Sequence, residues 1–123
     1  MGKLVRDRIP EIIEKSGEIP RIRILAEEEY RRCLEAKLDE EVAEFHADQN
    51  AEELADILEV VYALAESMGC TRGELFSCYE KKHAERGGFQ KRIFLTGKEW
   101  PLTPAIRRPI IPREILNLRS AKK

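Results

Sequence analysis

Residues 38–68 read LDEEVAEFHADQNAEELADILEVVYALAESM and contain two helical patterns joined by a short polar link. Each pattern carries two acidic residues three positions apart, Glu41 and Glu44 in the first and Glu53 and Asp56 in the second. Positions i and i+3 are neighbours on one face of a helix. An antiparallel hairpin of these helices would bring the two pairs together, so the stretch predicts a carboxylate cluster between two helical arms.

The apolar residues of the hairpin place these acids close to a core. At 100° per residue, Glu41 falls within the apolar arc of the first helix and Glu44 falls at its edge. The apolar residues of the second helix, which recur from Leu54 to Met68, leave little polar surface, which is typical of a buried helix. An unpaired carboxylate is costly to bury, so acids in these positions are functional or are neutralised by a partner. The apolar arc of the first helix comprises Tyr30, Leu34, Leu38, Val42 and Phe45.

The spacing of the acids allows two interpretations. Four converging carboxylates repel one another and raise each other's pKa unless a cation lies between them, and hard oxygen ligands suit Mg²⁺, Mn²⁺ or Ca²⁺. Alternatively, Glu53 and Asp56 favour the dipole at a helix N-terminus, in a chain that is 37% charged. From spacing alone, both interpretations stay open.

Length and composition limit the class of protein. The 123 residues suffice for one domain, and the hydrophobic fraction of 42% is that of a globular protein. No apolar run approaches the roughly 20 residues of a membrane-spanning helix. The three cysteines, Cys33, Cys70 and Cys78, form no C-x-x-C pair, so we expect reduced thiols in a cytoplasmic protein.

The charge is unevenly distributed. The net charge is −1, yet residues 101–123 hold six basic residues and one acidic residue. An acidic body argues against nucleic-acid binding by the main domain. The basic tail allows two interpretations, contact with an anionic partner or packing on the acidic body of the same or a neighbouring subunit.

Cap signals define the helices. Pro10 fits the first turn of a short helix that begins near Asp7 and stops at Gly17. Asn50 or a residue near it is the predicted cap of the second long helix. Thr71 with Glu74 forms a predicted capping box for the next helix. The predicted helices run from about residue 7 to 15, from 27 to about 48, from about 51 to about 67, and from 72 to 86.

The segments outside these helices are shorter or irregular. Residues 21–25 alternate basic and apolar side chains, and residues 89–95 resemble a strand, which leaves room for a small two-stranded β element. Prolines make 98–112 irregular. We therefore predict a helical domain at 1–97 and a basic tail at 98–123. Because the second long helix is apolar on so many sides, an all-α bundle assembled as a homodimer or a higher oligomer is the expected fold.

Lys82 and Arg86 lie on one stripe of the last helix, after Leu75 and Tyr79. Cations near a helix C-terminus favour the helix dipole. They also suit phosphate oxygens, which arginine binds through its two-pronged guanidinium. Both roles are open, although only the second predicts a function.

Three sequence blocks in this order resemble the MazG-type all-α nucleoside triphosphate pyrophosphohydrolases, especially the small house-cleaning members similar to phosphoribosyl-ATP pyrophosphohydrolases. The resemblance covers roughly residues 3–95. It implies cleavage of nucleoside triphosphates to a monophosphate and pyrophosphate, in dimers or tetramers. The blocks are KLVRDRIPEII at 3–13, the acidic helices with EEVAE at 40–44 and EELADILEVVYAL at 52–64, and KHAERGGF at 82–89.

The resemblance also assigns roles to residues. It implies that Mg²⁺ or Mn²⁺ is bound through an E-x-x-E and E-x-x-D set, with an additional acid at the position of Glu40. In the expected mechanism Glu40 or Glu41 is the general base, and Lys82 and Arg86 stabilise the phosphate charge. The set of metal ligands falls on Glu41, Glu44, Glu53 and Asp56.

Three questions stay open at this stage. Lys3 and Arg6 are either solvated surface residues or further phosphate ligands. The substrate is expected to be a non-canonical NTP or dNTP, with phosphoribosyl-ATP as the alternative. An alternative outside the enzymes is that the hairpin is a non-enzymatic dimerisation module whose acids keep it soluble.

Overall fold

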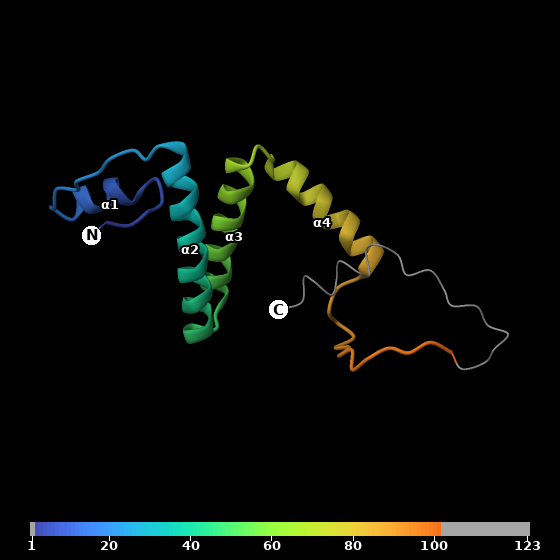
Figure 1. The fold of residues 1–123 in the computed structure, drawn as a ribbon. Coiled ribbons are helices and arrows are strands. Elements are labelled where there is room, and N and C mark those ends of the chain that lie inside the picture. Colours follow the sequence, from blue (N-terminus) through green and yellow to red (C-terminus); the bar gives the residue numbers. More distant parts are fainter. Residues whose placement is uncertain (1, 102–123) are drawn as a thin grey trace. The chain divides into compact units, whose positions relative to one another are not determined.

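The computed structural model describes residues 2–101, and every regular element in this range is a helix. The chain divides into one unit that ends at Gly87 and another that begins at Gly88. The predicted all-α class is confirmed. The helices, coloured along the chain in Figure 1, are α1 (Ile9–Lys15), α2 (Glu27–Asp48), α3 (Ala51–Ser67) and α4 (Arg72–Arg86).

The helix starts follow the cap signals in the sequence. Pro10 lies in the first turn of α1, where its missing N–H group leaves no hydrogen bond unmade. The side chain of Asn50 accepts a hydrogen bond of 2.9 Å from the backbone N–H of Glu53 at the start of α3. Thr71 and Glu74 form a reciprocal capping box at α4, with hydrogen bonds of 2.9 and 3.1 Å. The predicted starts of α3 and α4 are therefore confirmed.

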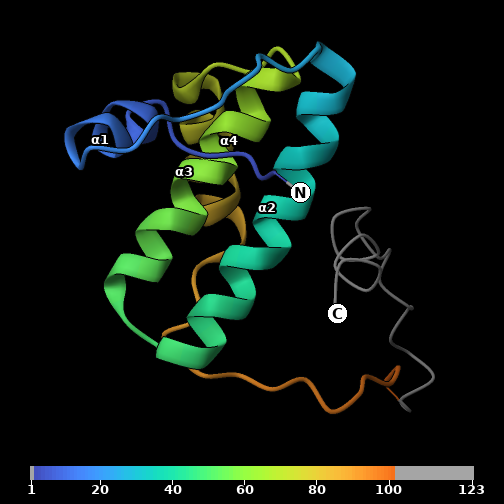
Figure 2. The same ribbon diagram turned by 90° about the vertical axis from the view of Figure 1, so that its left-hand side faces the viewer.

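Helices α2 and α3 lie side by side as an antiparallel hairpin, which both views show (Figures 1 and 2). At one end, Gln49 adopts a left-handed conformation with φ of 53°, which reverses the chain in a very short link. At the other end, the guanidinium of Arg31 on α2 donates a hydrogen bond of 2.5 Å to the carbonyl oxygen of Ser67. Both ends of the hairpin are thus fixed, so the facing side chains are held in register.

The core of the hairpin is small. Among the described residues, the buried apolar side chains are Leu34, Val60 and Ala65, and none of these is completely shielded from solvent. Helices α3 and α4 expose large apolar groups instead, with about half of each side chain accessible in Leu54, Leu58, Phe76 and Tyr79. The described unit therefore leaves much of its apolar helix surface uncovered.

The predicted β element is wrong. Residues 21–25 and 89–95 both lie in the described range and neither forms a strand. Arg92 takes a positive φ of 58° and its N–H group bonds to the carbonyl of Phe89, so a turn interrupts the second segment. An isolated pair of short strands is marginal in water, since its edges stay unpaired.

Two further predictions concern membrane-spanning helices and the C-terminal tail. Within residues 2–101, no helix has the length and apolarity needed to cross a membrane. The predicted tail begins at residue 98, and its residues 102–123 lie outside the described residues.

Candidate metal centre

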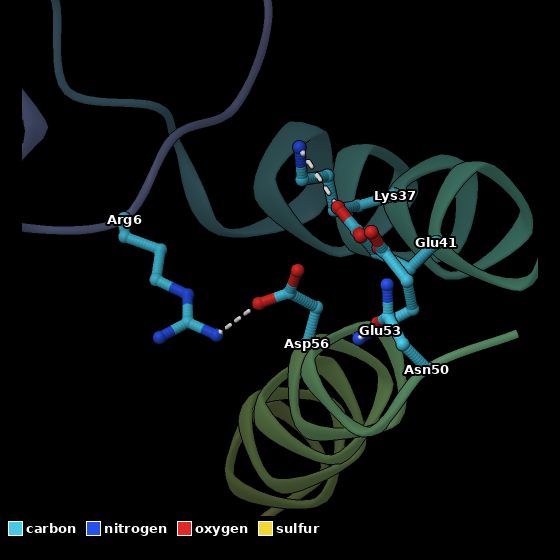
Figure 3. Close-up of polar contacts among 6 residues, drawn as sticks. All are labelled: Arg6, Lys37, Glu41, Asn50, Glu53 and Asp56. Atoms are coloured by element: carbon cyan, nitrogen blue, oxygen red, sulfur yellow. Dashed lines mark hydrogen bonds and ion pairs between the residues drawn. The ribbon is translucent and has the colours of Figure 1, made fainter. Parts of the chain in front are cut away.

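The hairpin brings three of the predicted acids together. Glu41 on α2 faces Glu53 and Asp56 on α3, and one oxygen from each carboxylate lies within 4.8 Å of the other two (Figure 3). Glu53 and Asp56 are on adjacent turns of α3, which is why both reach the same point. We call these three residues the acidic cluster. A set of three hard oxygen atoms can hold a divalent cation such as Mg²⁺ or Mn²⁺.

The cluster contains buried oxygen atoms without a hydrogen-bond partner in the described structure. Glu41 is only 6% exposed, and its Oε1 atom is one of them. The Oε1 atom of Glu53 is the other. Buried carboxylate oxygens that lack a donor are unfavourable, and most buried polar atoms in proteins are paired. The cluster is therefore deficient in positive charge and hydrogen-bond donors.

The pKa of Glu53 reflects this deficiency. Burial raises the pKa of its carboxyl group above the usual value, and nearby negative charges raise it further. These charges belong, from the largest effect on the pKa to the smallest, to Glu44, Asp48, Asp56 and Glu41. Glu44 thus acts on the cluster through its charge, although its side chain is exposed. Asp48, at the end of α2, is a contributor that the sequence analysis did not identify.

Two cations of the protein lie at the rim of the cluster. The ammonium group of Lys37 is 3.3 Å from Oε2 of Glu41 and 3.5 Å from Oε1 of Glu40. The Nη2 atom of Arg6 donates a hydrogen bond of 2.8 Å to Oδ1 of Asp56. Lys37 is not among the residues predicted for the site, although its spacing in the sequence is a signal for it. Lysine lies three and four positions before the two acids, so all three share a helix face.

The remaining predicted site residues lie apart from the cluster. Glu40 is half-buried and pairs with Lys37. Lys3, Lys82 and Arg86 are exposed, and no hydrogen bond or ion pair found within residues 2–101 connects them to the acidic cluster. The structure therefore brings together Glu41, Glu53 and Asp56, with Arg6 in contact with a carboxylate. The other predicted phosphate contacts are exposed to solvent.

The raised pKa of Glu53 predicts a pH dependence of stability. Above this pKa, the folded protein holds an unfavourable carboxylate, whereas the unfolded chain ionises freely above about 4.5. In EDTA we expect Glu53→Gln to be more stable than the parent at pH 7, with the difference shrinking as pH falls toward 5. Urea unfolding at both pH values measures this, with the exposed residue Glu52→Gln as control. A difference that grows on acidification would contradict the assigned environment.

No family model matches the chain. It is similar to an uncharacterized protein of Mycolicibacterium smegmatis, with 62% identity over 47 residues, which are 38% of this chain and 48% of that protein. The chain thus spans about half the length of the curated relative that it matches. No solved structure matches. Any assignment of function therefore depends on the geometry and chemistry of the acidic cluster.

Proposed function

We propose that this protein is a Mg²⁺-dependent (or Mn²⁺-dependent) nucleoside triphosphate pyrophosphohydrolase. It converts an NTP or dNTP and water to the monophosphate and pyrophosphate, and its expected substrates are non-canonical nucleotides. The observation that supports the proposal most strongly is the buried Glu41, whose Oε1 has no hydrogen-bond partner within residues 2–101 and whose carboxylate faces two carboxylates of the opposite helix. The sequence blocks described above resemble hydrolases of the MazG type, and that resemblance implies metal ligands at these same acids.

The proposed metal ligands are the acidic cluster together with Glu44. The cluster supplies carboxylate oxygens from two helices, the donor chemistry that Mg²⁺ prefers. Glu44 lies one turn after Glu41, and its charge already acts on Glu53. A bound divalent ion would supply the positive charge that balances these acids and the triphosphate of the substrate.

The residues of the chain perform the remaining tasks in this proposal. A carboxylate of Glu40 or Glu41 takes the proton of the attacking water. The water oxygen bonds to phosphorus while the bond between the α- and β-phosphates breaks, and the bridging oxygen leaves with the electron pair. Lys3, Arg6, Lys82 and Arg86 are the proposed contacts to phosphate oxygens.

A substrate panel tests the proposal. With Mg²⁺ present, we expect pyrophosphate release from at least one member of a panel of canonical and damaged NTPs and dNTPs, and no release in EDTA. Phosphoribosyl-ATP belongs in the panel because it is the alternative substrate. Release from phosphoribosyl-ATP alone would favour the alternative, and no release from any member would refute hydrolysis.

One observation favours the alternative function, that of a dimerisation module without catalytic activity. Apolar side chains of α3 and α4 are exposed, as a dimer interface requires. Thermal melting separates the two functions, since a cation that binds only the folded state raises the melting temperature by mass action. Mn²⁺ should stabilise the proposed hydrolase but have no effect on a plain dimerisation hairpin.

We also propose that the protein is a homodimer or a higher oligomer. Leu54 and Leu58 are about half exposed on one side of α3, and Phe76 and Tyr79 are similarly exposed on α4. A second copy that covers these side chains would give the hairpin a larger core than residues 2–101 of one chain provide. We expect light scattering after gel filtration to give the mass of at least two chains. A single-chain mass at micromolar concentration would contradict the proposal.

A further inference from the structure

The ion pair between Arg6 and Asp56 joins two distant parts of the sequence. Arg6 precedes α1, whereas Asp56 lies in the second turn of α3, and their side chains meet at 2.8 Å (Figure 3). Asp56 also belongs to the acidic cluster. A cation of the protein is therefore paired with a carboxylate that belongs to the cluster.

The two cations at the rim differ in how firmly they are held. Lys37 lies on α2 one turn before Glu41, and its side chain is only 18% exposed, so the helix itself keeps it in place. The side chain of Arg6 is 52% exposed and belongs to a segment without regular structure. The helix that follows this segment, α1, buries none of its residues. Of the two cations, Arg6 is therefore the one that can separate from its carboxylate with little loss of stability.

The acidic cluster has a position for a stronger cation. Glu41 is more than nine-tenths buried, its Oε1 has no hydrogen-bond partner among the described residues, and its carboxylate belongs to the same cluster as Asp56. Arg6 does not satisfy this atom, since its hydrogen bond goes to Asp56. A divalent ion would contact carboxylates of both helices, whereas an exposed ion pair contributes little to stability.

We propose that Arg6 is an exchangeable counterion of the metal centre. It pairs with Asp56 in the ion-free protein, and a divalent cation bound by the acidic cluster displaces it. The released guanidinium then binds phosphate oxygens of the nucleotide, for which its planar fork is suited. The inference rests on the proposed function, because it requires that the cluster binds a divalent ion.

The exchange makes Arg6 act in opposite directions on two ligands. It competes with the divalent ion, because the ion must remove it from Asp56. It favours the phosphate ligand, because the free guanidinium is a donor beside the loaded site. A residue that only holds the N-terminal segment in place would, when removed, weaken both kinds of binding. A solvated surface residue would affect neither.

Calorimetric titration of the full chain tests this prediction. For Arg6→Ala we expect Mn²⁺ to bind about threefold to fivefold more tightly, which is the scale of one exposed ion pair. We expect inorganic pyrophosphate to bind the Mn²⁺-loaded variant about tenfold more weakly, since a charge-assisted hydrogen bond is lost. Arg6→Gln provides a second variant, and circular dichroism verifies that both are folded.

Arg8→Ala is the matched control. It removes the same charge from the same segment, and no ion pair of Arg8 with the cluster is found in the described range. We expect both affinities of this variant to stay within twofold of the parent. Equal changes in the Arg6 and Arg8 variants would overturn the exchange in favour of general electrostatics. Unchanged or jointly weakened binding in the Arg6 variants would overturn it as well.

The titration also separates this inference from the proposed function. If Mn²⁺ binds the parent and the Arg6 variants do not show opposite effects, the exchange is wrong while the metal centre stands. If Mn²⁺ does not bind the parent, the metal centre itself is refuted, and the exchange fails with it.

Discussion

Asp56→Asn is expected to reduce Mg²⁺-dependent pyrophosphate release by about a thousandfold, because it removes one charged ligand from a cluster of three. Asparagine preserves the shape of the side chain and retains an oxygen that can accept the hydrogen bond from Arg6. The loss should therefore appear in turnover rather than in helix content. Pyrophosphate release at saturating Mg²⁺, alongside the far-ultraviolet circular dichroism spectrum, measures both.

The control for this prediction is Asp39→Asn. Asp39 is an exposed acid on α2, outside the acidic cluster. The change removes the same charge from the hairpin, so it reports the effect of net charge alone. We expect activity within about twofold of the parent, as for most surface changes. Full activity of Asp56→Asn, or equal losses in the two variants, would exclude Asp56 from the proposed metal centre.

The helices could be predicted from the sequence because local chemistry sets their limits. Pro10, Asn50 and the pair of Thr71 with Glu74 each satisfy or remove backbone donors at a helix start, and these effects do not depend on distant contacts. The β element failed for the opposite reason. A strand needs a partner, and alternation over five positions does not specify one.

The candidate site could be predicted only in part. Helical periodicity determines that Glu41 faces α3, so the acidic cluster could be predicted from the sequence. Glu44 lies at the edge of the apolar arc, and the structure places it in solvent. The contact of Arg6 with Asp56 joins residues 50 positions apart, and no local pattern specifies such a pair. The three acids of the cluster were therefore predictable from the sequence, whereas the contacts that Lys37 and Arg6 make with them were not predicted.

The second large effect is expected for Lys37→Met. Its ammonium group is 3.3 Å from Oε2 of Glu41, whose side chain is only 8% exposed. Removal of the ammonium group leaves a buried carboxylate without a counterion, whereas methionine retains the apolar part of the side chain. We expect the free energy of unfolding to fall by about 2 kcal/mol. Urea unfolding in EDTA at one fixed protein concentration measures the loss.

Lys15→Met is the matched control, because Lys15 and Glu11 form an i,i+4 pair of 3.9 Å at the surface, with side chains 78% and 55% exposed. Solvent screens this pair, so we expect a loss below about 0.5 kcal/mol. Addition of Mn²⁺ should recover part of the stability lost in Lys37→Met and none in Lys15→Met, since an ion bound by the cluster replaces the missing charge beside Glu41. Equal losses in the two variants would show that burial of Glu41 does not increase the contribution of its counterion to stability. If Mn²⁺ did not reduce the loss in Lys37→Met, the ion would not bind beside Glu41.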